Sequence, residues 1–593
     1  GVQTCALPIS RICAKGFQNP FPISWGTLPR PNHCLLVVSS MISPKFLLST
    51  CLSTSLICAL APAQYGGEWS YTREMQGEYG EIGFGLAMAM NGDMNGDGVD
   101  DILITAPGKA VGAGGIYLYD GALNTKIWVI NGEANADRLG KEIISMGDTN
   151  GDGYAEFVAS APGRDPGGNS YAGSIYLFDG QNPSNFTTID GEAPWDNFGV
   201  SLLRIPDMNN DGLDEIAVGA DMADGAVHVD AGRVYIFDGA APHNVLVRIE
   251  GVEPNSRFGS SLAVVGDVNQ DGVDDLLIGA KGTDVGLDLD VGRAFLVSGA
   301  DGSGILAVTG ESASGFFGSN VSEAGDANND GTPDFLVAAQ EYSDPVIGAE
   351  TGAVYMYNGA TGSLMRRWVG EAAGDKFGGS IAGNIDVNAD GVNDVIIGAH
   401  IKDLDNLPDT VAGAVYAYSG DGNDLLLSWY ATGTRERLGA ELEIVGDTDG
   451  DGYVEFFVAA PEWRPTPTDP RYGRIIQLEY NSWMAADNRD ISATTGGEIN
   501  LEIDFPDAAA NQNYSVLFSL GKGPYFVGGV PIPLSPGTLF WRTVGGDYNF
   551  LSSQTGMVGA LDANGVATGY INQLGLPSSF IGMEAYCAAV TID

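Results

Sequence analysis

Cysteine is almost missing from most of this chain. The 593 residues contain six cysteines, and five of them lie within the first 58 residues. Cys587 is the only one beyond that segment. A single thiol cannot form an intramolecular disulfide, so the main part of the chain has no disulfide framework. Its stability has to come from a packed core or from bound metal.

Basic residues are scarce as well. The chain has 28 Lys and Arg against 76 Asp and Glu, which gives a formal net charge of −48. Nucleic-acid binding needs a basic face that neutralises phosphates, so we exclude nucleic acid as a partner. A solubilising acidic surface would explain scattered acids. Many of these acids, however, recur at fixed positions of one short motif.

Signatures of common catalytic sites are missing too. The chain has four histidines, and it contains no H-E-x-x-H, no G-x-S-x-G, no Walker loop and no paired-cysteine metal site. The acid pair of a glycosidase stays open, since the separation of carboxylates cannot be read from sequence. We therefore expect a protein that is not an enzyme.

The first 63 residues contain two segments that we set apart from the fold. Residues Gly1 to Ile9 resemble a translated sequencing adapter, and residues 1–40 are interpreted as a non-native leader. Residues 41–63 have the pattern of a signal peptide, with Lys45, an apolar run over 46–60 and the small-residue site Ala61-Pro62-Ala63. The apolar run is shorter than the roughly 20 residues of a membrane span. We expect a secreted protein, extracellular, on the cell surface or periplasmic, with no span in the mature chain.

One unit recurs seven times between residues 64 and 482. Each copy has an FG or LG pair, an apolar strand, the motif D-x-[ND]-x-D-G-x-x-[DE] and a GAP-like tail, as in Phe198-Gly199 and Gly219-Ala220. A third strand follows, as at 232–237, and a fourth ends near a GE pair such as Gly370-Glu371. Four short strands in a repeat of about 60 residues are typical of a propeller blade. The sequence predicts a seven-bladed β-propeller over residues 64–482.

The two ends of the repeat array indicate how the ring closes. The segment 69–76 resembles a fourth strand, although it precedes the first FG pair. The seventh unit ends with its third strand at 473–479. We expect the N-terminal strand to complete the last blade, which would leave no open sheet edge.

These motifs resemble the FG-GAP repeats of integrin alpha-chain propellers and of their bacterial relatives. The resemblance covers about Tyr65 to Tyr480 and rests on seven matched copies. It implies a seven-bladed ring with calcium in hairpin loops on one face and ligand contacts on the other.

The acidic motif has the spacing of a calcium loop. Calcium takes six to eight oxygen ligands, and alternate side chains of a tight loop can direct oxygens to one centre. Position seven offers its carbonyl, and position nine closes the site. The expected ligands are Asp93, Asn95, Asp97, Val99 and Asp101; Asp148, Asn150, Asp152, Tyr154 and Glu156; Asp207, Asn209, Asp211, Leu213 and Glu215; Asp267, Asn269, Asp271, Val273 and Asp275; Asp326, Asn328, Asp330, Thr332 and Asp334; Asp386, Asn388, Asp390, Val392 and Asp394; and Asp447, Asp449, Asp451, Tyr453 and Glu455.

Polar hairpin turns are the alternative explanation for one such loop. Seven copies in one register favour metal, because a turn does not require an acid at position nine. Crowded carboxylates also repel one another unless a cation is present. We expect up to seven structural Ca²⁺ sites.

Residues 484–593 depart from the repeat and predict a small, sandwich-like all-β domain. The full prediction is an all-β chain, a seven-bladed β-propeller followed by this domain. We expect a monomeric, calcium-binding module that binds or adheres to an extracellular protein or polysaccharide through the loops at 164–171, 221–230, 341–350, 401–411 and 462–472. Two alternatives remain open: a polysaccharide lyase or hydrolase with its site at the propeller mouth, and a structural surface or matrix component.

Overall fold

The computed structural model describes residues 67–482 and separate strands between 485 and 592. Within 67–482 it omits residues 79–80, 91, 404–410, 421, 423–424, 432, 434, 449–452, 466–468 and 470. The predicted leader and signal peptide lie outside the described residues.

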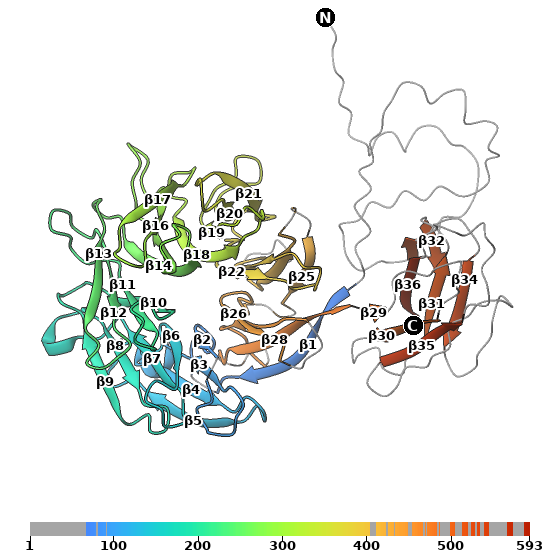
Figure 1. Ribbon diagram of the computed structural model, residues 1–593, viewed down its shortest axis with the longest axis horizontal. Coiled ribbons are helices and arrows are strands. Elements are labelled where there is room, and N and C mark those ends of the chain that lie inside the picture. The colour runs from blue at the N-terminus through green and yellow to red at the C-terminus, as the bar shows by residue number, and fades with distance from the viewer. Residues whose placement is uncertain are drawn as a thin grey trace, which may run out of the picture. The chain divides into compact units, whose positions relative to one another are not determined.

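Seven four-stranded sheets make up residues 67–482, and each sheet is one blade of a β-propeller. Figure 1 shows the blades arranged in a ring, with one strand of each nearest the centre. We number the blades from 1 to 7 by the order of these innermost strands. They are β2 (Met88–Ala89), β6 (Ile143–Gly147), β10 (Phe198–Ile205), β14 (Phe258–Gly266), β18 (Phe317–Gly325), β22 (Ser380–Ile385) and β26 (Leu442–Gly446).

Three further strands follow outward in each blade, every one antiparallel to its neighbour. The second strands are β3 (Ile102–Thr105), β7 (Glu156–Ala161), β11 (Glu215–Ala220), β15 (Asp275–Ala280), β19 (Asp334–Ala339), β23 (Asp394–Ala399) and β27 (Glu455–Ala460). The third strands are β4 (Gly115–Tyr119), β8 (Ser174–Phe178), β12 (Arg233–Phe237), β16 (Arg293–Val297), β20 (Ala353–Tyr357), β24 (Ala414–Tyr418) and β28 (Arg474–Ser482). The fourth strands are β5 (Lys126–Asn131), β9 (Phe186–Asp190), β13 (Val245–Glu250), β17 (Gly304–Thr309), β21 (Leu364–Val369), β25 (Leu425–Tyr430) and β1 (Gly67–Gln76).

The burial of the strands explains their composition. The second strands read as continuous apolar runs, and every residue of β11, β15, β19, β23 and β27 is buried between neighbouring blades. Strands covered on both faces lose the polar alternation of a half-exposed strand. The fourth strands β5 and β13 alternate between exposed and half-buried residues, as expected at the rim of the ring.

The FG pair links each blade to the one before it. Phe258 of blade 4 forms a parallel bridge to Gly232 of blade 3, and the same bridge recurs between Phe317 and Gly292. A side chain at residue 232 would place its Cβ 2.1 Å from the carbonyl oxygen of Phe258. Glycine is therefore required where the third strand begins, because only it permits this close approach of two backbones.

The predicted ring closure is confirmed. Strand β1 pairs antiparallel with β28, so that Trp69 lies opposite Tyr480 and Gln76 lies opposite Arg474. Blade 7 consequently has the order β26-β27-β28-β1. The first and last segments of the propeller are held together by the hydrogen bonds of one sheet.

Two short helical turns, α1 (Lys109–Gly112) and a 3-10 turn (Pro166–Gly168), follow second strands. No helix among the described residues has the length and apolar character to cross a membrane.

Beyond the propeller, the described strands are β29 (Ala485–Ala486), β30 (Glu498–Asp504), β31 (Asn513–Ser519), β32 (Pro524–Val527), β33 (Val530–Pro533), β34 (Leu539–Val544), β35 (Val566–Asn572) and β36 (Tyr586–Ile592). They pair as β29-β30-β35, β34-β31-β36 and β32-β33. The side-chain packing that would make this region a sandwich lies outside the described residues, so the sandwich stays a prediction.

Candidate metal centres

All seven acidic motifs occupy the same place in their blades. Each one connects the innermost strand to the second strand, and its position-nine acid stands at or just before the start of the second strand. The structure describes the five expected positions in each of the first six loops. In the seventh it describes Asp447, Tyr453 and Glu455, whereas Asp449 and Asp451 lie outside the described residues.

The position-one carboxylate organises the loop around itself. Oδ1 of Asp93 accepts hydrogen bonds from the backbone N–H groups of Gly96 (2.6 Å) and Asp97 (3.2 Å), and Oδ2 accepts one from Gly98 (2.7 Å). The bonds from positions five and six recur at Asp148, Asp207, Asp267, Asp326 and Asp386. In the second loop these N–H groups, that of Gly153 above all, lower the pKa of Asp148. These donors favour the ionised form of Asp148.

Positions three, five and seven are joined by a second set of hydrogen bonds. The backbone N–H of Asp97 donates to Oδ1 of Asn95, and that of Val99 donates to Oδ1 of Asp97, both over 2.9 Å. The bond from position seven to position five recurs at Tyr154, Leu213, Val273, Thr332 and Val392. The loop therefore curls so that its oxygen-bearing side chains share one concave side.

The position-nine acid closes the loop from the inside of the protein. Asp101 is fully buried; its Oδ2 accepts from the N–H of Met94 (2.9 Å), and its Oδ1 accepts from Nδ2 of Asn95 (2.9 Å) and from the N–H of Gly121 (3.1 Å). Burial raises the pKa of Asp101 to about 6, and the carboxylates of Asp97 and Asp93 add to the rise, while the backbone donors oppose it.

The same shift recurs around the ring. Burial, aided by the acids at positions one and five, raises the pKa of Glu215 and of Asp394 to about 7 and that of Asp334 to about 6. Burial also raises the pKa of Asp275. Ionising these buried groups costs more free energy than ionising an exposed acid, and a nearby positive charge would offset that cost.

Carboxylate oxygens converge most closely in the second and third loops. One ligand oxygen each from Asp207, Asp211 and Glu215 lies within 4.8 Å of the other two. Three carboxylates at this distance repel one another, and a bound divalent cation would remove the repulsion. The donors are oxygen atoms of carboxylates and amides, which is the ligand set preferred by Ca²⁺. The residues present therefore fit a calcium ion.

The structure adds one candidate ligand position that the sequence analysis missed. Asp179, directly after the third strand of blade 2, forms a convergent group with Asp152 and Glu156. In blade 3 the corresponding Asp238 adds to the raised pKa of Glu215. The signal was present in the sequence as an Asp-Gly pair after the third strands of blades 1 to 3, at Asp120, Asp179 and Asp238.

Blades 4 and 5 have neutral residues at this extra position. Oγ of Ser298 donates to Oδ2 of Asp271 over 3.0 Å, and Nδ2 of Asn358 donates to Oδ2 of Asp330 over 2.5 Å. The hairpin between the third and fourth strands thus lies against position five of the loop. Blades 1 to 3 have an acid at the corresponding residue, and in blade 2 this acid, Asp179, converges with the loop.

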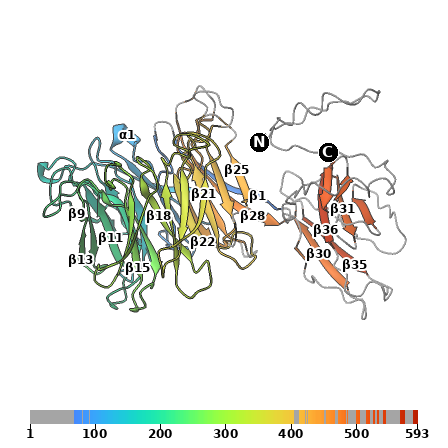
Figure 2. The same ribbon diagram turned by 90° about the horizontal axis from the view of Figure 1, so that it is seen from above.

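The long loops predicted to bind ligand lie at the other end of the blades. They connect second to third strands, whereas the acidic loops connect innermost to second strands, so the two sets stand at opposite ends of the second strand. Figure 2 shows the blades from the side, with α1, which lies in the second-to-third strand connection of blade 1, at the upper edge. Val346 and Val227 in these loops are 91% and 83% exposed. Leu287, in the equivalent connection of blade 4 that the sequence analysis did not select, is 96% exposed. Parts of the loops at 401–411 and 462–472 lie outside the described residues.

The fold and the loops together define a seven-bladed β-propeller with repeated acidic hairpin sites. In a comparison with known families, the profile of the FG-GAP repeat matches residues 89–119, 142–178, 198–237 and 258–305. The chain thus contains FG-GAP repeats in a seven-bladed β-propeller, and its sequence is similar to integrin alpha chains.

Three relatives illustrate the similarity. The chain is 30% identical to Integrin alpha-5 of Xenopus laevis over 231 residues (36% of this chain, 20% of the relative). It is 33% identical to Integrin alpha-4 of Xenopus laevis over 200 residues (31% and 18%), and 29% identical to Integrin alpha-V of Gallus gallus over 231 residues (36% and 21%). The match spans about a fifth of the length of these relatives.

Proposed function

We propose that this protein is a secreted, calcium-stabilised binding module that engages an extracellular protein or polysaccharide and catalyses no reaction. The observation that carries the proposal is the repeated acidic loop, whose buried position-nine acid has a raised pKa in blades 1, 3, 4, 5 and 6. A scaffold that places such a group in blade after blade needs a compensating cation in each.

Calcium in these loops has a structural role in this proposal. The loop joins two strands of one blade, and in blade 2 Asp179 of the third-strand hairpin adds a further oxygen. A cation held by all of them ties three strands together at one end. Closed oxygen cages leave no coordination position for a substrate, which favours a structural ion over a catalytic one.

Ligand binding is assigned to the long loops between second and third strands. They stand on the face away from the acidic loops, and their exposed aliphatic tips, such as Leu287 and Val346, have no role in the core. Binding residues often lie on loops that a rigid scaffold positions. The similarity to integrin alpha chains supports a binding role for the propeller.

Thermal unfolding during a calcium titration tests the proposal. The purified chain is treated with chelator and calcium is added back, while the melting temperature and the number of bound ions are measured. We expect a saturable rise with several ions per chain, because a site filled at ~100 Kd contributes ~2.7 kcal/mol. An unchanged melting temperature with no bound ion would refute the metal role.

The binding face is tested with paired variants. Leu287→Asp and Val346→Asp change exposed tips, so they should leave the calcium-induced stabilisation intact and weaken attachment to extracellular material. The double variant Asp386→Asn with Asp390→Asn should reduce the calcium-induced stabilisation and leave attachment intact. If the tip variants attach as well as the unaltered protein does, the long-loop face is not the binding surface.

A further inference from the structure

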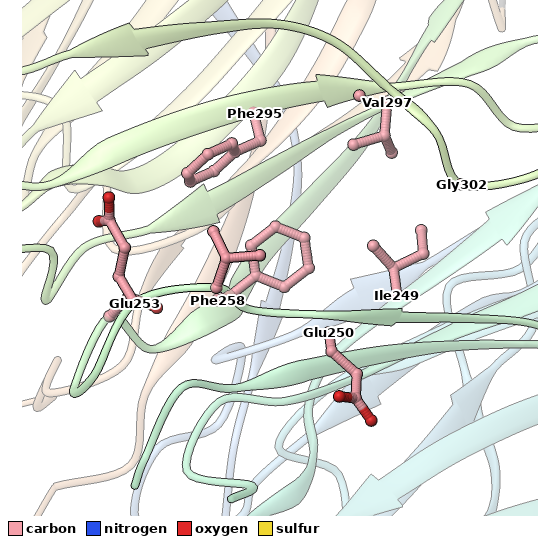
Figure 3. Close-up of a pocket in the computed structure, with 10 residues that line it drawn as sticks. Ile249, Glu250, Glu253, Phe258, Phe295, Val297 and Gly302 are labelled. Atoms are coloured by element: carbon pink, nitrogen blue, oxygen red, sulfur yellow. The ribbon is translucent and has the colours of Figure 1, made fainter. Parts of the chain in front are cut away.

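A cavity of about 160 Å³ lies between blades 3 and 4, and none of its lining residues is one of the expected calcium ligands. Its apolar wall includes Ile249 of β13 together with Phe258, Phe295 and Val297 of blade 4. Figure 3 shows these side chains around a common space, with the carboxylate of Glu253 beside Phe295 and that of Glu250 directed away from it.

The cavity exists because blade 4 lacks an aromatic ring that other blades have. In blades 1, 2, 3, 5 and 6 the third strand ends in a pair of rings two residues apart, as in Tyr235 and Phe237 of blade 3 (centroids 5.9 Å apart) and Tyr355 and Tyr357 of blade 5 (6.4 Å). The FG phenylalanine packs edge-on against both rings, as Phe317 does in blade 5. In blade 4 the second ring is replaced by Val297, and the FG phenylalanine Phe258 contacts Phe295 alone.

The residue opposite Val297 on the fourth strand is also smaller than in the neighbouring blades. Gly304 of β17 pairs with Val297, where blade 3 has Val245 opposite Phe237 and blade 5 has Leu364 opposite Tyr357. A Cβ atom at residue 304 would meet nothing within 4 Å. The missing ring and the missing side chain together leave the space unfilled.

Blade 4 also lacks an arginine that its neighbours, blades 3 and 5, have on their fourth strands. In blade 3, Arg248 lies opposite Tyr235, stands over its ring at 5.0 Å and forms an ion pair with Glu192. In blade 5, Arg367 lies opposite Tyr355 and binds Glu311 over 2.9 Å. The corresponding residue of blade 4 is Ala307, opposite Phe295.

The loss of this arginine leaves half of a carboxylate without a partner. Glu253 corresponds to Glu192 of the preceding blade, but it stands two residues after the glycine of the GE pair instead of one. Its Oε1 binds a guanidinium nitrogen of Arg293 over 2.6 Å, as Glu192 binds Arg233. Its Oε2 is buried and has no hydrogen-bond partner among the described residues. A buried acceptor without a donor costs free energy, so a ligand that supplies a donor here is favoured.

We propose that this cavity binds a ligand in which an aromatic ring carries an ammonium or guanidinium group. The ring takes the place of the aromatic side chain that Val297 replaces, and the cation takes the place of the missing arginine, above Phe295 and against Oε2 of Glu253. The size is sufficient, since an apolar cavity of about 150 Å³ in a protein binds benzene. Cation–π attraction to Phe295 and the charge-assisted hydrogen bond to Glu253 select the cationic group.

Binding of three small probes to the purified chain tests the proposal. Phenethylammonium has the ring and the cation, benzyl alcohol has the ring alone, and 3-phenylpropionate has the ring with the opposite charge. Titration calorimetry or NMR should show phenethylammonium binding most tightly, benzyl alcohol more weakly and phenylpropionate weakest. If phenethylammonium does not bind, or if all three bind equally, the proposal is wrong.

Three variants locate the site. Val297→Phe restores the ring and should abolish binding of every probe, whereas the matched change Val245→Phe, at an exposed position outside the cavity, should not. Glu253→Gln should weaken phenethylammonium about tenfold, the size expected for loss of a charge-assisted hydrogen bond, and leave benzyl alcohol unchanged. Ala307→Arg should likewise exclude the amine, with Ser428→Arg at the equivalent position of blade 6 as control.

The variants remain informative if one of them misfolds, because each is paired with a control of the same type and the probes are also compared on the unaltered protein. Phenethylammonium bound equally well by Val297→Phe would place the binding elsewhere and overturn the proposal. A further arm compares the free amine with a peptide that contains an internal Phe-Arg pair. Tighter binding of the free amine would identify the ligand as a small molecule, and tighter binding of the peptide would identify it as a protein segment.

Discussion

Asn95 donates a hydrogen bond from its side-chain amide to Oδ1 of Asp101 over 2.9 Å, and this bond joins position three of the first acidic loop to position nine. The same bond occurs between Asn209 and Glu215 and between Asn328 and Asp334. It draws the loop over a buried carboxylate. The loop and the strand that it precedes are therefore one unit, and a cation bound to the loop acts on the core of the blade.

Replacing the buried acid should remove one calcium site. We expect Asp101→Asn to lower the number of bound ions by one and to reduce the calcium-induced stabilisation by up to ~2.7 kcal/mol, the contribution of one site at ~100 Kd. The neighbouring Asp100 is exposed and stands outside the ligand positions, so Asp100→Asn is the matched control. Calorimetry with a calcium count measures both effects. Equal behaviour of the two variants would contradict the assignment of position nine.

The calcium-free protein should lose stability as the pH rises. The folded-state pKa is raised to about 6 for Asp101 and Asp334 and to about 7 for Glu215 and Asp394, well above the ordinary values of these groups. Between about pH 4 and 7 the folded state therefore binds more protons than the unfolded state, and stability falls with rising pH.

Calcium should reverse this dependence, because it stabilises the ionised form that high pH produces. Melting temperatures between pH 4.5 and 7.5, with chelator and with saturating calcium, measure the effect. The calcium-induced rise should grow with pH. A rise that is the same at both ends of this range would show that the buried acids do not bind the ion.

The extra carboxylate of blade 2 should strengthen its loop. Asp179 converges with Asp152 and Glu156, so Asp179→Asn should weaken calcium binding at that loop severalfold. Blade 5 offers the reciprocal experiment, because Asn358 already lies against Asp330. Asn358→Asp should tighten the fifth loop. Site-resolved titration by NMR follows both changes, and an unaltered affinity in both variants would exclude this position as a ligand.

Removal of β1 should cause association. Strand β28 pairs with β1 over the length of that strand, and its edge is left unpaired when residues up to Gln76 are deleted. Exposed strand edges pair with other chains. Sedimentation velocity should show oligomers or aggregates in place of the monomer that we expect for the complete chain. A stable monomer after the deletion would mean that β1 does not close the ring.

The predictable part of this structure was local in sequence. Repeated FG pairs, acidic motifs and apolar runs predicted seven blades and the strand at 69–76 that completes the last one, and the fold confirms both. The loop ligands could be proposed because their spacing along a single turn determines where their oxygens point. The raised pKa of Asp101 could not be predicted from the sequence, because it depends on burial beneath a hairpin about 20 residues further along the chain.

The sequence by itself determined the repeat, the number of blades and the acids in each loop, because these follow from periods and spacings within a few residues. Only the tertiary structure decided that Asp179 joins the second loop and that Val297, Gly304 and Ala307 leave a cavity beside Glu253. Both features arise where side chains from different strands or blades meet. A small residue in a strand does not reveal an empty space until the neighbours that would have filled it are in place.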